Sequence, residues 1–267
     1  MSAVIAPADA PGRPLRGAGV LITRPARQAA GLARRIDALG GAAIVFPAIV
    51  ILPPADAQPL ARAHARLSGY DFAIFVSANA VEYGAPDPRR WPAALLAFAP
   101  GPGTAEALAD VGIANVRVPA TTFDSDGLLA LPELADPRDK RVLIFRGDGG
   151  REQLGDALRA RGAHVDYVPC YRRAKPQSGA AGVAEAFAGH RIDAVTITSS
   201  EGLDNLWEIV DAVTRDVWRA CPTFVPHPRI ALHARALGLR AVETAGSDAG
   251  LIAGLLQWFA AHPPRNT

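Results

Sequence analysis

Short apolar runs alternate with amphipathic segments along most of the chain. Four of the runs are short and rich in β-branched or aromatic residues, as is typical of buried β-strands. These runs are Val20–Ile22, Phe72–Val76, Val142–Phe145 and Ala194–Thr198. Apolar residues recur with helical spacing at 29–39, 105–111 and 154–158. Alternating strands and helices predict parallel α/β layers joined by crossover connections.

The sequence also repeats itself at a shift of 122 residues, which pairs Val20 with Val142 and Arg24 with Arg146. The same shift pairs Leu32 with Leu154, Pro47 with Pro169, Ser77 with Ser199, and Ser125–Asp126 with Ser247–Asp248. After a small change of offset, Pro102 pairs with Pro228. Chance would not place such matches in one ordered series, so the sequence predicts two similar α/β units.

The junctions that follow the strands carry the candidate chemistry. Ligands of open parallel sheets bind beyond the carboxyl ends of the strands, where helix N-termini present free N–H groups. With two similar units, we expect the ligand in the cleft between them. The junctions are Thr23–Pro25, Ser77–Val81, Gly101–Thr104, Arg146–Arg151 and Thr198–Gly202. Because arginine can clamp carboxylates or phosphates with two hydrogen bonds, such a site suits an anionic ligand.

Each of these side chains also has a plain structural interpretation. Hydroxyl groups such as those of Ser77, Ser199 and Thr104 commonly cap helices. The two repeat-related arginines can be solvated, or paired with local acids such as Asp148. The residue types leave both interpretations open.

Composition and charge narrow the function. The chain has 267 residues, of which 49% are hydrophobic and 20% charged, enough to build a packed core. A net charge of +2 argues against a general nucleic-acid binder. The N-terminus has no basic leader and no apolar run reaches bilayer-spanning length, so we expect a cytoplasmic protein without a membrane segment.

Standard cofactor and metal motifs are missing from the sequence. The segment Gly101–Gly103 lacks the third glycine of a dinucleotide-binding loop, and there is no GxxxxGK[ST] loop, GxSxG elbow or HExxH pair. Cys170 and Cys221 have no metal-ligand spacing and form no disulfide framework. We therefore predict neither a cofactor nor a metal, and an enzyme that works by positioning its substrate.

Eight motifs occur in order between Gly19 and Phe259. They are Leu21–Pro25, Phe75–Val81, Gly101–Ala105, Ser125–Leu128, Arg146–Arg151, Val168–Arg173, Thr198–Leu203 and Ser247–Asp248. Together they resemble the uroporphyrinogen-III synthase family. The resemblance implies an α/β protein with two similar lobes, each a flavodoxin-like parallel sheet flanked by helices, joined by two extended linkers that act as hinges.

The resemblance also implies an order of domains that the sequence alone does not. The repeat by itself suggests two consecutive domains. The family instead implies a first lobe made of 15–47 plus 174–262, a second lobe at 52–168, and linkers at 48–51 and 169–173. Residues 1–14 and 263–267 are expected to be disordered tails.

By this resemblance the chain is a cyclising lyase of haem biosynthesis that needs no cofactor or metal. Its substrate would be hydroxymethylbilane, a linear tetrapyrrole with acetate and propionate arms. The reaction removes the terminal hydroxyl as water, inverts the last pyrrole ring through a spiro intermediate and closes the macrocycle. Spontaneous closure proceeds without inversion, so the enzyme must hold the chain in the shape that favours inversion.

The resemblance assigns roles to individual residues. Tyr171 matches a linker tyrosine that helps the hydroxyl leave, although packing is an equal alternative for it. The residues expected to bind carboxylate arms are Ser77, Ala78, Asn79, Gly101, Gly103, Thr104, Ser199 and Ser200, with Arg24, Arg146 and Arg151 as further anchors. His227–Ile230 departs from the Gly101–Thr104 pattern, so either His227 or Arg229 would contact a carboxylate there, or that side of the cleft would bind fewer groups.

Two other functions stay open at this point. The chain could be a non-catalytic two-lobed module that binds a tetrapyrrole or another small molecule, or a nucleotide-dependent α/β enzyme, which the missing phosphate loops disfavour. As partners we expect an anionic tetrapyrrole, the preceding enzyme of the pathway in transient contact, and no nucleic acid or membrane. We expect a monomer.

Overall fold

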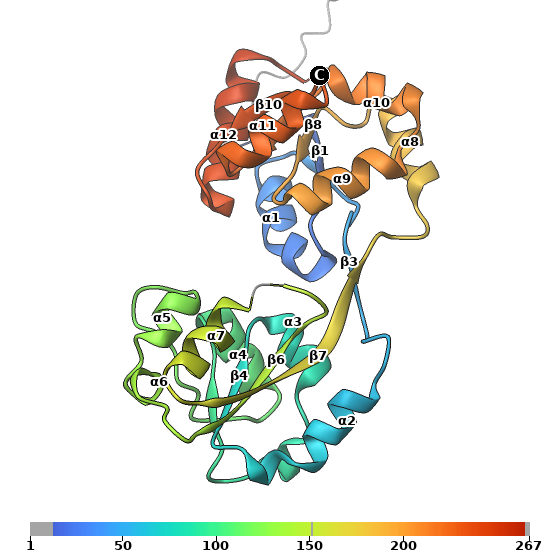
Figure 1. Cartoon of the computed structure of the whole chain (residues 1–267). Coiled ribbons are helices and arrows are strands. Elements are labelled where there is room, and N and C mark those ends of the chain that lie inside the picture. Colours follow the sequence, from blue (N-terminus) through green and yellow to red (C-terminus); the bar gives the residue numbers. More distant parts are fainter. Residues whose placement is uncertain (1–12, 151, 265–267) are drawn as a thin grey trace, which may run out of the picture. The chain divides into compact units, whose positions relative to one another are not determined.

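The computed structural model describes residues 13–150 and 152–264 of the chain (Figure 1). Most of the two predicted tails, 1–14 and 263–267, lies outside these residues, and so does Arg151. The chain divides into two compact units: one runs to Val50 and resumes at Ala174, and the other is Ile51–Arg173. None of the described helices is long and apolar enough to cross a membrane.

The unit built from both ends of the chain is a parallel sheet between two layers of helices (blue, and orange to red, in Figure 1). Its strands are β1 (Gly19–Ile22), β2 (Ala42–Val45), β8 (Ala194–Thr196), β9 (Pro222–Val225) and β10 (Arg240–Glu243). Helices α1 (Ala26–Ala38) and α12 (Asp248–Ala261) pack on one face. The other face carries α8 (Ala180–Ala188), α9 (Ser200–Ile209), α10 (Ala212–Arg219) and α11 (Pro228–Ala236).

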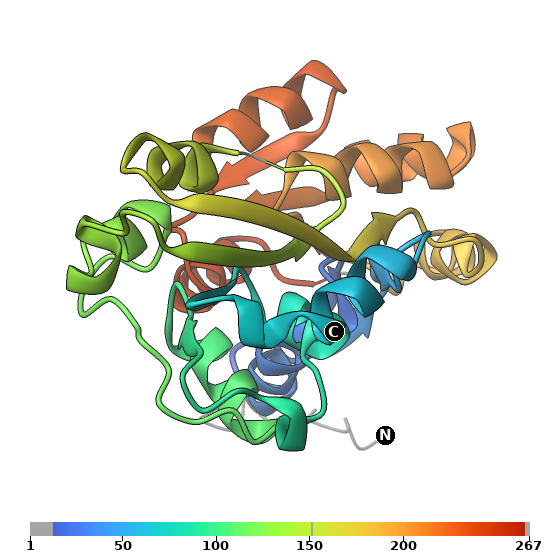
Figure 2. The same cartoon turned by 60° about the horizontal axis from the view of Figure 1, so that its bottom comes forward.

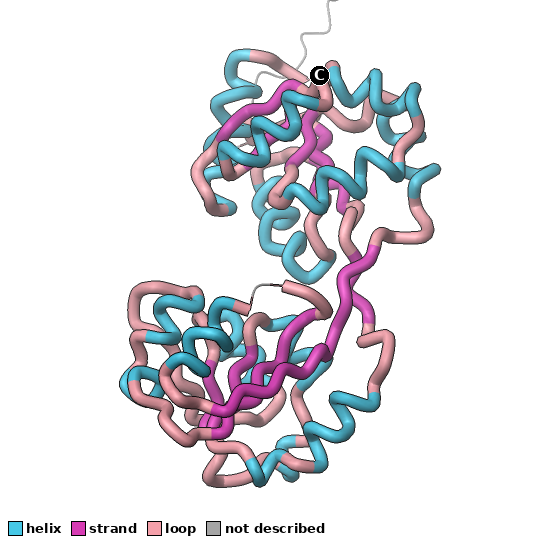
Figure 3. Tube along the Cα trace, in the orientation of Figure 1, coloured by secondary structure: helices cyan, strands magenta, loops and turns pink. Residues whose placement is uncertain are grey.

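The central unit has the same layers (Figure 3). Its strands are β3 (Val50–Leu52), β4 (Phe72–Phe75), β5 (Leu96–Phe98), β6 (Arg141–Gly147) and β7 (His164–Ala174). One face packs against α2 (Gln58–Ala65), α3 (Ala78–Gly84) and α4 (Pro102–Asp110), and the other against α5 (Ser125–Leu129), α6 (Pro132–Ala135) and α7 (Gln153–Ala160). Two short 3₁₀ turns lie at Leu67–Gly69 and Pro88–Arg90.

The two sheets have equivalent strand orders. In the terminal unit the order is β2-β1-β8-β9-β10, which is the 2-1-3-4-5 order of flavodoxin-like sheets. The central unit shows β3-β7-β6-β4-β5, in which β7-β6-β4-β5 corresponds to β2-β1-β8-β9 and β3 is an additional strand beside β7. Arg117, which bridges to Phe98, takes the position that corresponds to β10. Strands related by the sequence repeat therefore occupy equivalent places, as β1 and β6 do, and β8 and β4. This confirms the prediction of two similar parallel α/β units.

The apolar runs located the central strands well and the outer strands poorly. The four predicted strands correspond to β1, β4, β6 and β8, and the predicted helices to α1, α4 and α7. Strands β2 and β10 were not predicted because both are exposed at their ends and only half-buried between them. The segment 169–173, expected as a separate linker, belongs to the long strand β7, which runs beside β6 (Figure 2).

Repeat-related leucines at the middle of each sheet test the two cores. Leu21 and Leu143 are both fully buried. Replacing either with alanine removes packed methyl groups and leaves a cavity, so each variant should lose about 2–5 kcal/mol of unfolding free energy in urea titration. Leu232→Ala is the control, because 67% of that side chain is exposed. A loss for Leu21→Ala or Leu143→Ala as small as the loss for Leu232→Ala would contradict this packing.

Candidate active site

A pocket of about 290 Å³ lies in the central unit, at the carboxyl ends of β4, β6 and β7. Between β6 and β4 the order of the sheet reverses, and this is where open parallel sheets bind ligands. The loop Gly147–Gly150 after β6 and the end of β7 form much of its wall. Arg146 and Tyr171, two of the residues selected from the sequence, both line it.

Arg146 is a buried cation that lies against an aromatic ring. Only 9% of the residue is exposed, and its guanidinium lies 4.7 Å from the centre of the Tyr167 ring. Among the described residues no acid is paired with Arg146, and this includes Asp148, the acid considered from the sequence. A cation held on an aromatic face in a pocket is a good binding group for a carboxylate.

Tyr167 holds that arginine in place and was not selected from the sequence. Its hydroxyl donates to the carbonyl of Glu152 at 3.0 Å and accepts from the N–H of Gly155 at 3.1 Å. The ring is therefore fixed against the start of α7. The one sequence signal that could have identified it is its position in the strand that also carries Tyr171.

Tyr171 is 4% exposed, and its hydroxyl lies 3.3 Å from the Oγ of Ser77. Ser77 caps α3, since its Oγ accepts the N–H of Ala80 at 3.2 Å. The two interpretations of this serine are thus compatible, because one oxygen caps the helix and also contacts the phenol. The phenol and the hydroxyl meet where β4 and β7 end.

Cys170, beside Tyr171, is excluded as a nucleophile. Burial raises the pKa of its thiol to about 12, so the sulfur stays protonated at neutral pH. No group of three or more His, Cys, Asp or Glu side chains is arranged to hold a metal within residues 13–150 and 152–264.

The remaining candidates of the central unit are not part of the pocket lining. Ala78 and Asn79 stand in the first turn of α3, the former exposed and the latter half-buried. Gly101 is the N-cap of α4, Gly103 is exposed, and Thr104 is 8% exposed. These residues follow β5, the strand next to β4, so they stand at the same edge of the sheet.

In the other unit the repeat-related serine caps a helix as Ser77 does, and a histidine takes the capping position that corresponds to Gly101. Ser199 caps α9 by accepting the N–H of Gly202 at 3.0 Å, and Ser200 is the first residue of that helix. His227 caps α11, where its Nδ1 accepts the N–H of Arg229 at 3.1 Å.

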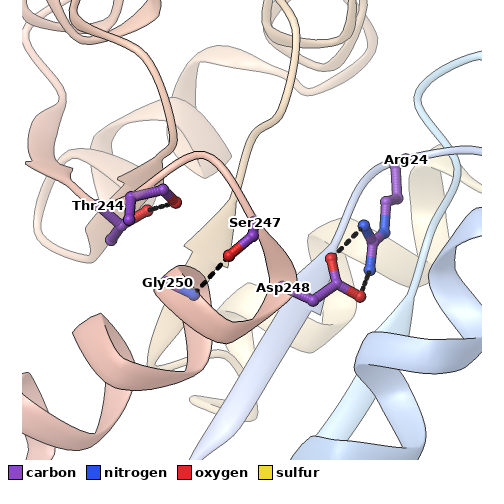
Figure 4. Close-up of polar contacts among 6 residues, drawn as sticks. Arg24, Thr244, Ser247, Asp248 and Gly250 are labelled. Atoms are coloured by element: carbon purple, nitrogen blue, oxygen red, sulfur yellow. Dashed lines mark hydrogen bonds and ion pairs between the residues drawn. The ribbon is translucent and has the colours of Figure 1, made fainter. Parts of the chain in front are cut away.

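Arg24 binds both carboxylate oxygens of Asp248, at 2.7 and 2.9 Å (Figure 4). Asp248 stands in the first turn of α12, directly after the N-cap Ser247. The repeat counterparts of this pair are Arg146 and Asp126, which make no such contact in the described part of the chain. Repeat-related arginines therefore differ: Arg24 is neutralised inside its own unit, and Arg146 is not.

Comparison with known protein families gives a consistent result. Residues 30–252 match the family model described as uroporphyrinogen-III synthase HemD. The uroporphyrinogen-III synthase of Salmonella typhimurium is 38% identical over 241 residues, covering 86% of this chain and 97% of that protein. The Escherichia coli protein of the same name is 35% identical over 238 residues, with the same shares covered.

Solved structures show the same fold. A mutant uroporphyrinogen III synthase of Thermus thermophilus matches with a TM-score of 0.55 at 17% identity, over 92% of this chain and 100% of that chain. A uroporphyrinogen-III synthetase of Helicobacter pylori matches with a TM-score of 0.54 at 13% identity, over 91% and 99%.

The Arg24–Asp248 pair predicts a pH dependence of stability. The hydrogen bond from Arg24 lowers the pKa of Asp248. The pair therefore stabilises the fold above the pKa of the unfolded carboxyl, about 3.9, and this stabilisation is lost as pH falls through the lower folded value. Asp248→Asn should lower Tm at pH 7, and its deficit should shrink below about pH 4.

Thermal unfolding between pH 7 and pH 3 measures this deficit. The exposed Asp216, which pairs with Arg219 within one helix, is the control, and Asp216→Asn should change Tm little at any pH. A deficit for Asp248→Asn that stays constant with pH would show that the charge of Asp248 is not what stabilises the fold.

Proposed function

We propose a mechanism for this chain, which belongs to the uroporphyrinogen-III synthase family and is therefore a cyclising lyase of porphyrin biosynthesis. The proposed substrate is hydroxymethylbilane, which loses one water as its last pyrrole ring is inverted and the macrocycle closes. One observation supports placing this chemistry in the central unit. The pocket there combines the phenol of Tyr171 with Arg146, which is buried and pairs with no acid among the described residues.

Arg146 is proposed to bind a carboxylate arm of the substrate. A guanidinium can donate two parallel hydrogen bonds to one carboxylate, which fixes the orientation of that arm as well as its position. The stacking on Tyr167 keeps the guanidinium plane in place before the substrate arrives. Backbone N–H groups of Gly101 and Gly103 and the hydroxyl of Thr104 are proposed to hold further arms.

Tyr171 is proposed to be the proton donor. As its proton passes to the terminal hydroxyl, the carbon–oxygen bond breaks, its electron pair leaves with the water, and the pyrrole nitrogen supplies electrons to form an azafulvene. The last ring then attacks the azafulvene through the ring carbon that already carries its bridge, and the new carbon–carbon bond gives the spiro intermediate. The bond from that carbon to its old bridge breaks and re-forms at the other α-carbon of the last ring, which inverts the ring and closes the macrocycle. The proton that the substrate loses when its rings regain aromaticity restores the phenol, so one water is the net product.

Ser77 is proposed to assist this transfer. Its oxygen already accepts the N–H of Ala80, so its own hydrogen can point at the phenol oxygen 3.3 Å away. A hydrogen bond in that direction favours the phenolate that forms when Tyr171 gives up its proton.

We also propose that the enzyme acts in the cytoplasm as a monomer. Cys170 and Cys221 are both buried and form no disulfide, as suits a reducing compartment. Because free hydroxymethylbilane closes spontaneously to the wrong isomer, a transient contact with the enzyme that supplies it would limit that loss.

Tyr171→Phe removes one hydroxyl and tests the proton donor. Turnover should fall by about 10²-fold or more while KM changes little, since the ring that packs in the pocket is kept. The assay supplies hydroxymethylbilane, oxidises the product and separates type III from type I uroporphyrin. Tyr70→Phe is the control, because that phenol binds Asp166 and lies outside the pocket lining.

Wild-type turnover in Tyr171→Phe would assign the tyrosine to packing. Type I uroporphyrin alone, at saturating wild-type enzyme, would instead show a non-catalytic binding module.

Arg146→Met tests the carboxylate anchor. Loss of a charged hydrogen-bond donor costs about 1.5–3 kcal/mol, so KM should rise by roughly 10- to 100-fold. Arg146→Lys keeps the charge without the planar pair of donors, so its KM should lie between the KM of the wild type and the KM of Arg146→Met. Arg141→Met is a matched control. Arg141 also stacks on a tyrosine, at 5.2 Å from the centre of the Tyr70 ring, but it stands at the start of β6, at the other end of the strand from Arg146. An unchanged KM in Arg146→Met would show that Arg146 does not bind the substrate.

A further inference from the structure

The strand that carries Tyr171 is irregular at the site. Along β7 the pairing with β6 advances one residue at a time until Arg146 meets Pro169, and the next pair is Gly147 with Tyr171. Cys170 is therefore an extra residue, opposite no residue of β6. An extra residue of this kind is a β-bulge, and it redirects the side chains that follow it.

The bulge decides which way the phenol points. Val168, Cys170 and Tyr171 all belong to the buried cluster on the α2–α4 face, whereas Val165 and Tyr167 pack on the opposite face. Successive side chains of a regular strand alternate between faces, so Cys170 and Tyr171 could not share one. Without the bulge, Tyr171 would point to the face of Tyr167, away from Ser77.

Cys170 fits the bulge closely. It is fully buried, and its thiol lies 3.2 Å from the carbonyl oxygen of Arg146 and 3.6 Å from that of Ala80. The sulfur also fills the space that a side chain at Gly84 would need, because a Cβ there would come within 2.8 Å of it. A small side chain that can donate a hydrogen bond suits this position between β6 and α3.

Gly147 completes the arrangement from the neighbouring strand. A Cβ at this residue would lie 2.8 Å from Cε2 and Cζ of Tyr171 and 3.1 Å from its hydroxyl. The backbone of Gly147 is outside the positive-φ region, so alanine is acceptable to the main chain there. The conflict would be with the tyrosine ring alone, which would have to move.

We propose that Gly147 and Cys170 are positioning residues that aim the Tyr171 phenol at its reacting position. The proposal rests on the proposed role of Tyr171 as proton donor. Cys170 supplies the bulge that turns the tyrosine toward Ser77, and Gly147 leaves the room in which its ring lies. Neither residue donates a proton or needs to touch the reacting atoms.

Gly147→Ala tests this in a double-mutant cycle with Tyr171→Phe. Because a displacement of about 1 Å can cost up to about 10²-fold, Gly147→Ala alone should lower kcat by about 10- to 100-fold. In the Tyr171→Phe background there is no hydroxyl left to misplace, so the same change should lower kcat by less than about twofold. A purely structural role would lower kcat equally in both backgrounds, and that result would overturn the proposal.

Cys170 variants provide a second test that does not depend on Gly147→Ala folding. Cys170→Ala removes the donor to the Arg146 carbonyl and should lower kcat, again only when the Tyr171 hydroxyl is present. Cys170→Ser keeps a donor and should retain most of the activity. Gly182→Ala is the control glycine, because a Cβ there meets nothing within 4 Å. Equal kcat in Cys170→Ala and wild type would show that Cys170 does not position the Tyr171 phenol.

A crystal structure of Gly147→Ala separates this proposal from the proposed function. The Tyr171 hydroxyl should lie farther from Ser77 Oγ than the 3.3 Å found here. A phenol that has not moved would overturn the positioning role whatever the activity. Wild-type turnover in Tyr171→Phe, with a displaced phenol in Gly147→Ala, would instead reject the proton donor and leave the positioning intact.

Discussion

A guanidinium that is removed from water must find an anion or another favourable neighbour, because an isolated buried charge is very costly. Within the described residues Arg146 lies on the face of Tyr167 and pairs with no acid, whereas its repeat counterpart Arg24 binds both oxygens of Asp248. In the described part of the chain, the central unit therefore presents a positive charge without an ion-pair partner at the edge of the sheet where ligands bind. The assignment of substrate arms, and the place of Tyr171 beside them, depend on this one difference.

The internal repeat explains how such a difference could arise. Two sheets with equivalent strand orders supply equivalent loops after β1 and β6, and an arginine stands at each of these strand ends, Arg24 just after β1 and Arg146 in the last residues of β6. In one copy the acid at the start of α12 reaches the arginine. In the other copy the equivalent Asp126 does not, and a tyrosine from β7 lies under the guanidinium instead. The same framework thus gives a closed ion pair in one unit and an open pocket in the other.

Much of this could be predicted from the sequence because it is local. The apolar runs identified β1, β4, β6 and β8, and the repeat indicated two similar units. The partner of Arg24 could not be predicted, since Asp248 lies 224 residues away and the repeat offers Arg146 the same acid. The side of the sheet toward which Tyr171 points could not be predicted either. Strand alternation gives the wrong face there, and a bulge leaves no signature in a pattern of apolar residues.

A crystal structure of the enzyme with bound tetrapyrrole product would decide whether Arg146 binds the substrate. We expect an acetate or propionate carboxylate within hydrogen-bond distance of the Arg146 guanidinium, and the phenol of Tyr171 facing the carbon that carried the departing hydroxyl. A bound product with no carboxylate in the Arg146 pocket would show that this arginine is not the anchor.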